Sequence, residues 1–488
     1  MKHLISINDL EAKEIFEEIL PGCKSMIPRA RERKIVPRPE KKVIFAFFEP
    51  STRTRGSYVE ASRLLGWSSD VITGTEATSL SKKESMANTA RMFALQGADV
   101  LVMRTKMEGA QKFIAEILEK ENYNVSVQNG GDGTNQHPSQ TMLDLLTISE
   151  RLGGLDNFKI GFFGDLKYGR TVHSLICALA HRDNISLALA SDPETALQEQ
   201  YKKLFSNVSE GDSLELLKDC DVIYGSRLQE ERFVGDQVAL ERAKKRFRIN
   251  NKTLSIFKPH VIIMHPMPYV NEFAPDIRQN KQLIIDEQAW HGIPVRMYLL
   301  EEGYKNKNIK SFPDVNPDNG IQILKNIPLP EYFEIRQNSK NSDMYFLPIT
   351  NGTVIDHIAH GLGLKIRQFL FSKNILINGV KHTIEDVPSG KHGLKDVLVL
   401  ENIFIPEELM VGISSFDPQI TFNIISEGNF CKIKIRTTKA ISGIGICPNK
   451  NCITNDDPEA SAKFLHRDND GSLECYYCEK TFKQKEVI

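Results

Sequence analysis

The chain has 488 residues, of which 41% are hydrophobic and 26% are charged, and its formal net charge is −1. At about 150 residues per domain, this length predicts about three domains instead of one hydrophobic core. The composition is ordinary for a soluble globular protein, and the balanced charge excludes a whole-chain basic field for nucleic acid. A charged ligand must therefore be bound by a local cluster of side chains.

The beginning of the sequence, MKHLISINDLEAKEIFEEIL, has charges every few positions and lacks the apolar segment of a signal peptide. No apolar run approaches the roughly 18 residues of a membrane span. We therefore expect a cytoplasmic protein with neither a membrane nor a nucleic-acid partner.

Up to about residue 300, short apolar runs alternate with longer amphipathic segments. The runs are typical of buried parallel strands, and the segments between them are typical of helices. The predicted strands are KKVIFAFF, ADVLVM, FKIGFFGD, ISLALAS, CDVIYG and HVIIMHP. This alternation predicts an α/β fold, in which ligands bind at the carboxyl ends of the strands.

The stretch FFEPSTRTR follows the first of these strands and places Ser51, Thr52, Arg53, Thr54 and Arg55 at the start of a predicted helix. Hydroxyls and guanidiniums at a helix N-terminus suit a phosphate, because the first N–H groups are unpaired and carry partial positive charge. A capped helix with solvated arginines explains the same residues. The two interpretations remain open on these residues alone.

A second polar stretch, NGGDGTNQHPSQTMLDLL, predicts a tight loop that leads into another helix. His137 and Gln140 lie within one turn of each other and could polarise a carbonyl group. A single loop histidine is more often a surface residue, by roughly two to one.

These two stretches, together with GDLKYGRTVHSL and HPMPYVNEF, resemble the aspartate and ornithine carbamoyltransferases. The resemblance covers roughly residues 1–303, with four motifs in the same order. The aspartate branch fits better, because Arg227 and Gln229 follow a strand and His-Pro-Met-Pro replaces the His-Cys-Leu-Pro of the ornithine branch.

The resemblance implies a ligand set for each substrate. Carbamoyl phosphate would bind Ser51, Thr52, Arg53, Thr54, Arg104, His137 and Gln140. Aspartate would bind Lys83, Arg170, Arg227, Gln229, Met267 and Pro268. The implied catalytic residues are Arg53, Thr54, Arg104, His137 and Lys83. The amine attacks directly, so no catalytic cofactor is expected.

In the resembling family, a serine and a lysine reach the active site of a neighbouring subunit, which here implies Ser79, Lys83 and a catalytic trimer. The usual Lys-Gly-Glu of this loop is Lys82-Lys83-Glu84 in the present chain. The missing glycine leaves open which of the two lysines acts.

Beyond about residue 302 the composition changes to Asn, Lys, Pro and Asp, which predicts a linker with room for short structured pieces. The segments MYFLPITNGTVIDHI, FSKNILING, KDVLVLEN and NFCKIKIRTT then predict strands, with one helix at HGLGLKIRQFLF. A small α+β domain is expected here.

Four of the eight cysteines lie near the C-terminus, at Cys447, Cys452, Cys475 and Cys478. Two close pairs separated by a short loop are typical of a tetrahedral zinc site in a reducing compartment. We expect one structural Zn²⁺ per chain, since four protein ligands leave no open position. Four free cysteines in a small core are the alternative, held at roughly one in ten.

This second half resembles the regulatory chain of aspartate carbamoyltransferase over roughly residues 343–488, through NGTVIDHI, VPSGKHGLKDVLVLEN and the cysteine segment. The resemblance implies ATP, CTP or UTP as effectors, bound by Asp356, His357 and Lys395. Val399 stands where the family usually has a lysine that contacts the nucleotide. Nucleotide binding is therefore expected to be weakened or altered.

The sequence thus predicts two parallel-sheet α/β domains, an α+β nucleotide-binding domain and a small β zinc-binding domain. The expected boundaries are 1–137 for carbamoyl phosphate, completed by a helix at about 290–303, 138–289 for aspartate, 304–342 for the linker, 343–441 for nucleotide and 442–488 for zinc. The expected function is an allosteric fusion enzyme that carbamoylates aspartate for pyrimidine biosynthesis. Transfer to ornithine or another amine, and a non-catalytic regulatory scaffold, are the alternatives.

Overall fold

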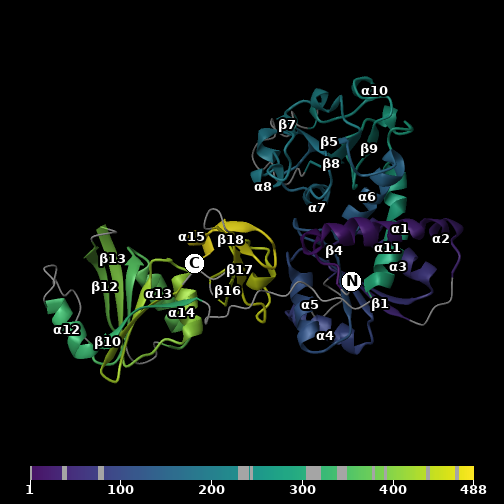
Figure 1. The fold of residues 1–488 in the computed structure, drawn as a ribbon. Coiled ribbons are helices and arrows are strands. Elements are labelled where there is room, and N and C mark those ends of the chain that lie inside the picture. The colour runs from purple at the N-terminus through teal and green to yellow at the C-terminus, as the bar shows by residue number, and fades with distance from the viewer. Residues whose placement is uncertain are drawn as a thin grey trace. The chain divides into compact units, whose positions relative to one another are not determined.

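The computed structural model describes residues 3–35, 41–74, 82–228, 241, 244, 246–303, 320–337, 349–375, 380–389, 393–435, 440–443, 445–467 and 472–487. The chain divides into two compact units, Met1–Lys310 and Ser311–Ile488, and each is described by itself. Figure 1 shows the elements in chain order.

The first unit begins with a four-stranded parallel sheet of order β2-β1-β3-β4. Its strands are β1 Lys42–Phe47, β2 Ser68–Thr73, β3 Val100–Thr105 and β4 Ser126–Asp132. The helices of this part are α1 Leu20–Ser25, α2 Ile27–Glu32, α3 Thr52–Leu65, α4 Met86–Leu95 and α5 Ala110–Lys120. β3 and β4 are buried along their whole length, and their charged residues, Arg104 and Asp132, lie near or at the carboxyl ends of the strands.

A second parallel sheet has five strands in the order β7-β6-β5-β8-β9. These are β5 Lys159–Gly164, β6 Ser186–Ala190, β7 Val208–Gly211, β8 Val222–Ser226 and β9 Ile262–Met264. Its helices are α7 Arg170–Leu179, α8 Glu199–Lys202 and α10 Asn251–Leu254. The strand–helix alternation of the sequence is therefore confirmed in both sheets.

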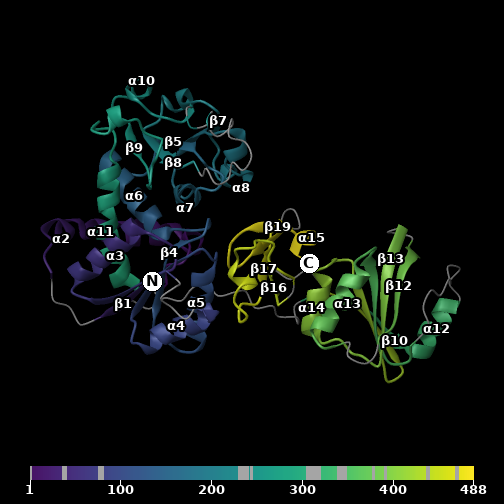
Figure 2. The same ribbon diagram turned by 180° about the vertical axis from the view of Figure 1, so that it is seen from behind.

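Two long helices, α6 Pro138–Leu152 and α11 Ile285–Gly303, lie between the sheets and pack against each other (Figures 1 and 2). Proline at the first position of α6 suits a helix start, since it has no N–H to leave unpaired. Gly153 ends α6 with φ 79°, a conformation that costs glycine little. One apolar cluster contains residues of α6, α11 and β5, so these helices join the two sheets.

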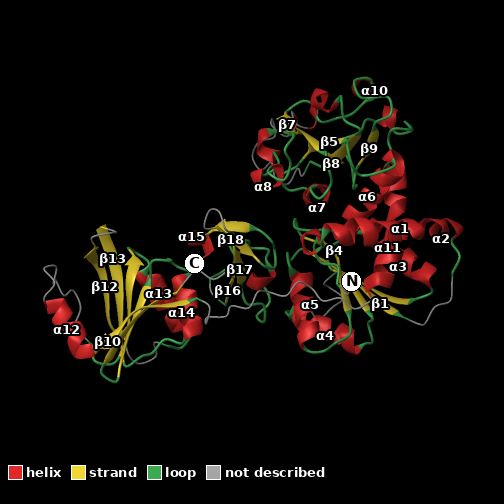
Figure 3. Ribbon diagram, in the orientation of Figure 1, coloured by secondary structure: helices red, strands yellow, loops and turns green. Residues whose placement is uncertain are grey.

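The second unit contains a six-stranded antiparallel sheet of order β10-β15-β14-β11-β13-β12. The strands are β10 Ile321–Pro328, β11 Gly352–Ala359, β12 Val380–Ser389, β13 Gly393–Glu401, β14 Thr421–Ser426 and β15 Asn429–Ile435. Its helices are α12 Leu329–Gln337, α13 Gly363–Ser372 and α14 Glu407–Ser414. Figure 3 shows α12 on one side of this sheet and α13 and α14 on the other.

The linker predicted over 304–342 is wrong for its second half. β10 pairs with β15 along the edge of the sheet, and α12 follows it directly. Four of the eight residues of β10 are Ile or Leu, but Ile323 and Leu324 are exposed, as expected of an edge strand. Its lysine and asparagine content therefore hid a strand that belongs to the six-stranded sheet.

Two other details of this unit differ from the sequence prediction. FSKNILING was predicted as a strand, but its first residues close α13 and form a turn through Ile375, while 376–379 lie outside the described residues. The helix α14 was not predicted, because its sequence, EELMVGIS, is short and mostly apolar.

The C-terminal part of the second unit is a four-stranded sheet of order β16-β17-β18-β19. Its elements are β16 Ala440–Ser442, β17 Lys463–His466, β18 Ser472–Cys475, β19 Thr481–Lys483 and α15 Gln484–Val487.

Candidate active site and metal centre

The neighbouring strands β1 and β3 bring a carboxylate and a guanidinium together where both strands end. Phe47 pairs with Arg104, and the N–H of Phe48 donates to the carbonyl of Arg104 at 2.9 Å. Glu49 follows immediately, and its Oε2 lies 3.3 Å from Nε of Arg104. The carboxyl end of the first sheet therefore carries a buried ion pair beside the start of α3.

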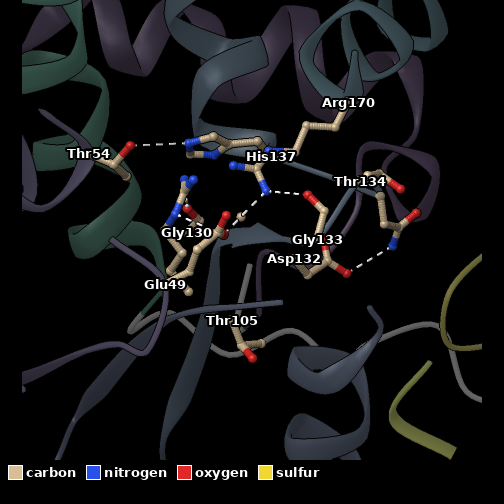
Figure 4. Close-up of polar contacts among 12 residues, drawn as sticks. Glu49, Thr54, Thr105, Gly130, Asp132, Gly133, Thr134, His137 and Arg170 are labelled. Carbon is tan, nitrogen blue, oxygen red and sulfur yellow. Dashed lines mark hydrogen bonds and ion pairs between the residues drawn. The ribbon is translucent and has the colours of Figure 1, made fainter. Parts of the chain in front are cut away.

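Arg170 joins this pair from the second sheet, as Figure 4 shows. Its Nη1 lies 3.7 Å from Oε2 of Glu49 and donates to the carbonyl of Gly133. Arg104 in turn donates to the carbonyl of Gly130 at 3.1 Å. The carboxylate thus lies between two guanidiniums, one from β3 and one from the start of α7.

The loop that accepts these bonds needs glycine at position 131. Gly131 has φ 119°, and a Cβ atom there would lie 2.8 Å from Nη1 of Arg104. Both the backbone conformation and the close approach therefore exclude a side chain. The NGGDG sequence is explained by the approach of two arginines to the backbone.

The pocket keeps its arginines charged despite burial. Burial, together with the positive charges of Arg170, Arg296 and Arg53, lowers the pKa of Arg104 to about 9, although Glu49 opposes the shift. A pKa near 9 still leaves Arg104 protonated at neutral pH. The site therefore presents several cations around the carboxylate of Glu49, which suits a ligand with two negative charges.

His137 is the residue before α6 and is held neutral. Burial lowers its pKa well below the usual value, and the charges of Arg170, Arg104 and Arg296 lower it further. Its Nε2 lies 3.3 Å from Oγ1 of Thr54 (Figure 4). Its Nδ1 is buried without a hydrogen-bond partner among the described residues. A neutral imidazole thus has one hydrogen-bonding position left for a ligand.

The start of α3 supplies the remaining donors. Ser51 precedes the helix in an extended conformation, and its side chain makes no capping hydrogen bond. The first N–H groups of α3 are therefore open to an anion, and Thr52 and Arg53 are exposed beside them. This is the arrangement that the phosphate interpretation of the STRTR stretch requires.

His265 links Arg53 and Arg227 with the loop that contains Met267. It is buried, and burial together with the charges of Arg53 and Arg227 lowers its pKa to about 3. Its Nδ1 accepts a hydrogen bond from the N–H of Met267 at 2.9 Å. The charges of Arg53 and Arg227 therefore act on one histidine, and the loop of Met267 is attached to it.

The structure does not test four of the residues implied by the resemblance. Ser79 and Gln229 lie outside the described residues. Lys83 is exposed with φ 67°, and Pro268 is exposed as well. The roles assigned to these positions stay predictions.

Two functional candidates were missed from sequence. Glu49 stands next to the STRTR stretch, and its position at a strand end was the available signal. Arg296 lies within α11, is 2% exposed, and donates to Oγ of Ser57 at 2.6 Å. A single arginine inside the apolar run IPVRMYLL is the pattern that could have identified it.

The three residues predicted to bind a nucleotide, Asp356, His357 and Lys395, lie together on the six-stranded sheet. Nζ of Lys395 lies 2.6 Å from Oδ1 of Asp356, and Nδ1 of His357 lies 3.3 Å from its Oδ2. Burial raises the pKa of Asp356, but hydrogen bonds and charges of His357 and Lys395 outweigh it and lower the pKa. Lys395 is therefore already paired with a carboxylate inside the protein.

Helix α12 covers the same face of this sheet. Side chains alternate between the two faces along β11, so Asp356 shares a face of the sheet with Val354. Val354 packs in an apolar cluster with Val399. Tyr332 of α12 stacks on Phe430 of that cluster, with ring centroids 3.8 Å apart and planes at 11°. Val399, which replaces the lysine usual in the family, is explained as part of this core.

The four C-terminal thiols converge as predicted. Cys447, Cys452, Cys475 and Cys478 are buried, and their sulfur atoms lie within 4.8 Å of one another. The pairs Cys447–Cys478 and Cys452–Cys475 each have a sulfur separation of 3.7 Å. Tetrahedral zinc with Zn–S bonds of about 2.3 Å places its sulfurs about 3.8 Å apart. The residues present therefore fit a structural zinc ion.

Comparison with known proteins now identifies the class. Residues 2–150 match the family model described as aspartate/ornithine carbamoyltransferase, carbamoyl-P binding domain, and residues 156–302 match its Asp/Orn binding domain. Residues 346–437 and 439–488 match the allosteric and metal binding domains of the aspartate carbamoyltransferase regulatory chain. The chain therefore combines catalytic and regulatory modules of a carbamoyltransferase.

The relatives narrow the class further. The chain is 40% identical to an aspartate carbamoyltransferase catalytic subunit of Methanobrevibacter smithii, over 63% of this chain and 96% of that protein. It is 39% identical to the corresponding subunit of Archaeoglobus fulgidus, over 62% of this chain and 99% of that protein. The chain belongs to the aspartate carbamoyltransferase family.

Solved structures agree with this fold. The catalytic subunit of M. jannaschii aspartate transcarbamoylase has a TM-score of 0.57 and 38% identity, covering 62% of this chain and 97% of that one. The enzyme of Trypanosoma cruzi, solved with carbamoyl phosphate and aspartate, has a TM-score of 0.56 and 27% identity, covering 61% of this chain and 95% of that one. Among the described residues, no helix combines the length and hydropathy that crossing a bilayer requires.

Proposed function

We propose that the chain transfers the carbamoyl group of carbamoyl phosphate to the amine of L-aspartate, which yields N-carbamoyl-L-aspartate and phosphate for pyrimidine biosynthesis. The observation that carries this proposal is the group of Arg104, Arg170 and neutral His137 around the open start of α3.

The phosphate of the first substrate would bind the N–H groups and hydroxyls at the start of α3, with Arg53 neutralising the leaving group. Arg104, Thr54 and His137 would donate to the carbamoyl oxygen, where negative charge develops as the amine attacks. Because His137 is neutral, its proton stays on the ring and serves as a hydrogen-bond donor. The reaction then depends on proximity and on oriented charge.

The second substrate brings two carboxylates, which would bind Arg170 and Arg227. Glu49 already neutralises part of the charge on Arg170. Binding of aspartate would therefore compete with, or rearrange, an ion pair that exists before substrate enters.

The test is the initial rate of ureido product from carbamoyl phosphate with aspartate, and with ornithine as the alternative amine. We expect turnover with aspartate and none with ornithine. Preference for ornithine would contradict the assignment. Tight binding of a bisubstrate analogue without turnover would instead favour a regulatory scaffold.

Three finer points belong to the same proposal. We expect catalytic trimers, in which Lys83 and Ser79 complete the site of a neighbour, and sedimentation of the purified chain tests this. None of the eight cysteines forms a disulfide bond, which suits a reducing compartment such as the cytoplasm. Nucleotide effectors would bind near Asp356, His357 and Lys395, weakly, because Lys395 is paired and α12 covers the face.

A further inference from the structure

Asp144 is a fully buried carboxylate at the centre of the first unit, outside the ligand sets described above. Its side chain accepts hydrogen bonds from Gln140 Nε2 at 2.9 Å, Tyr224 Oη at 2.8 Å and Gln288 Nε2 at 2.7 Å. These donors come from α6, β8 and α11. Asp144, itself on α6, thus links α11 and the second sheet to α6.

A carboxylate that accepts from an amide nitrogen fixes which way the amide faces. Because Oδ1 of Asp144 accepts from both Gln140 and Gln288, Gln140 turns its Nε2 toward Asp144 and its Oε1 away. The group that Gln140 offers to a ligand is therefore an acceptor. A carbamoyl group carries N–H donors that match it, whereas the methyl group of acetyl phosphate does not.

The same carboxylate fixes a second amide. Gln288 donates to Asp144 and accepts from the N–H of His265 at 2.8 Å. His265 in turn accepts from the N–H of Met267 at 2.9 Å. The loop that would hold the attacking amine is therefore attached to Asp144 through Gln288.

From these contacts we infer that Asp144 is a positioning residue that fixes the orientation of Gln140, so that the site selects an acyl phosphate bearing N–H donors, and that it anchors the His265 loop through Gln288. This inference rests on the proposed carbamoyl transfer.

The test compares the wild type, Asp144→Asn and the matched control Tyr224→Phe, using the full chain. Asparagine can donate to Gln140 and so allows its amide to turn, while Tyr224→Phe removes only the third hydrogen bond. The readout is the KM for carbamoyl phosphate relative to the inhibition constant of acetyl phosphate. We expect Asp144→Asn to lower this discrimination about tenfold and Tyr224→Phe to retain it.

Loss of discrimination in Asp144→Asn alone supports the inference, and equal discrimination in all three proteins overturns it. No turnover by the wild type would be a failure of the proposed function instead. If Asp144→Asn does not fold, Gln288→Leu replaces it. That variant should raise the KM for aspartate about tenfold and leave the KM for carbamoyl phosphate unchanged, and unchanged values for both would overturn the anchoring role.

Discussion

At the residue scale, the site depends on an arginine that stays charged although it is buried. Arg104 has 9% of its surface exposed, yet its pKa stays at about 9, because Glu49 partly offsets burial and the neighbouring arginines. Burial and the charges of Arg170, Arg104 and Arg296 lower the pKa of His137 and keep it neutral. Glu49 and His137 therefore determine the charge of the site before the ligand binds.

Replacing Arg104 by Ala should lower kcat about 10²- to 10³-fold, since a preorganised donor to the developing oxyanion is lost. The measurement is the steady-state rate with aspartate at saturating carbamoyl phosphate. The control is Arg91→Ala, which removes a half-buried arginine paired with Glu121 and should leave the rate unchanged. A loss of less than fivefold in Arg104→Ala would remove Arg104 from the chemistry.

Asp144 should also make stability depend on pH. Burial raises its pKa to about 7, against which its hydrogen bonds act. Because the folded state holds a proton that the unfolded state releases, stability from this group is present at low pH and is lost as pH rises toward 7. The difference between pH 5 and pH 7 is about 2 kcal/mol.

Asp144→Asn should therefore flatten the change of unfolding free energy between pH 5 and pH 7 relative to the wild type. Urea unfolding followed by tryptophan fluorescence measures this in the intact chain, because Trp67 and Trp290 are its only tryptophans and both lie in the first unit. A wild-type difference that persists unchanged in the variant would show that Asp144 remains ionised throughout.

At the element scale, the sequence predicted those elements whose patterns are strong. The strands of the first unit were found because their runs are continuous and buried, and α3 and α6 because Pro50 and Pro138 mark their starts. β10 was missed because a lysine and an asparagine interrupt its apolar residues at a sheet edge. Glu49 and Asp144 were missed because their roles come from contacts with residues distant in sequence.

Helix α12 gives the prediction at the element scale. Tyr332→Ala should remove the ring that stacks on Phe430 and weaken the packing of α12 on the face of the sheet that carries Asp356 and Lys395. We expect the affinity for ATP or CTP, measured by calorimetry, to increase about tenfold, since stacking contributes about 0.5–1.5 kcal/mol beyond burial.

Ile335→Ala is the matched control, because that side chain is on the same helix and 44% exposed. It should leave nucleotide affinity unchanged. Equal affinities in the wild type and Tyr332→Ala would mean that α12 does not limit access to this face.

At the scale of the whole molecule, catalytic and regulatory modules share one chain but form separate compact units. The first unit contains all the residues that the mechanism uses within a single chain. The second contains the thiol cluster and the covered sheet. Folding of the zinc module and chemistry at the active site should therefore respond to different perturbations.

Cys475→Ser should reduce bound zinc from one per chain to none and loosen the sheet β16–β19, because Cys475 ends β18 and pairs with Phe464 of β17. Structural zinc sites contribute about 10–16 kcal/mol of apparent binding energy, which a module this small cannot replace with its own core. We expect limited proteolysis to begin within 440–488 while the basal rate of carbamoyl transfer falls less than twofold. Cys431→Ser, outside the cluster, is the control and should keep both zinc and protease resistance. Abolished turnover in Cys475→Ser with the oligomer intact would show instead that the zinc module acts directly on the active site.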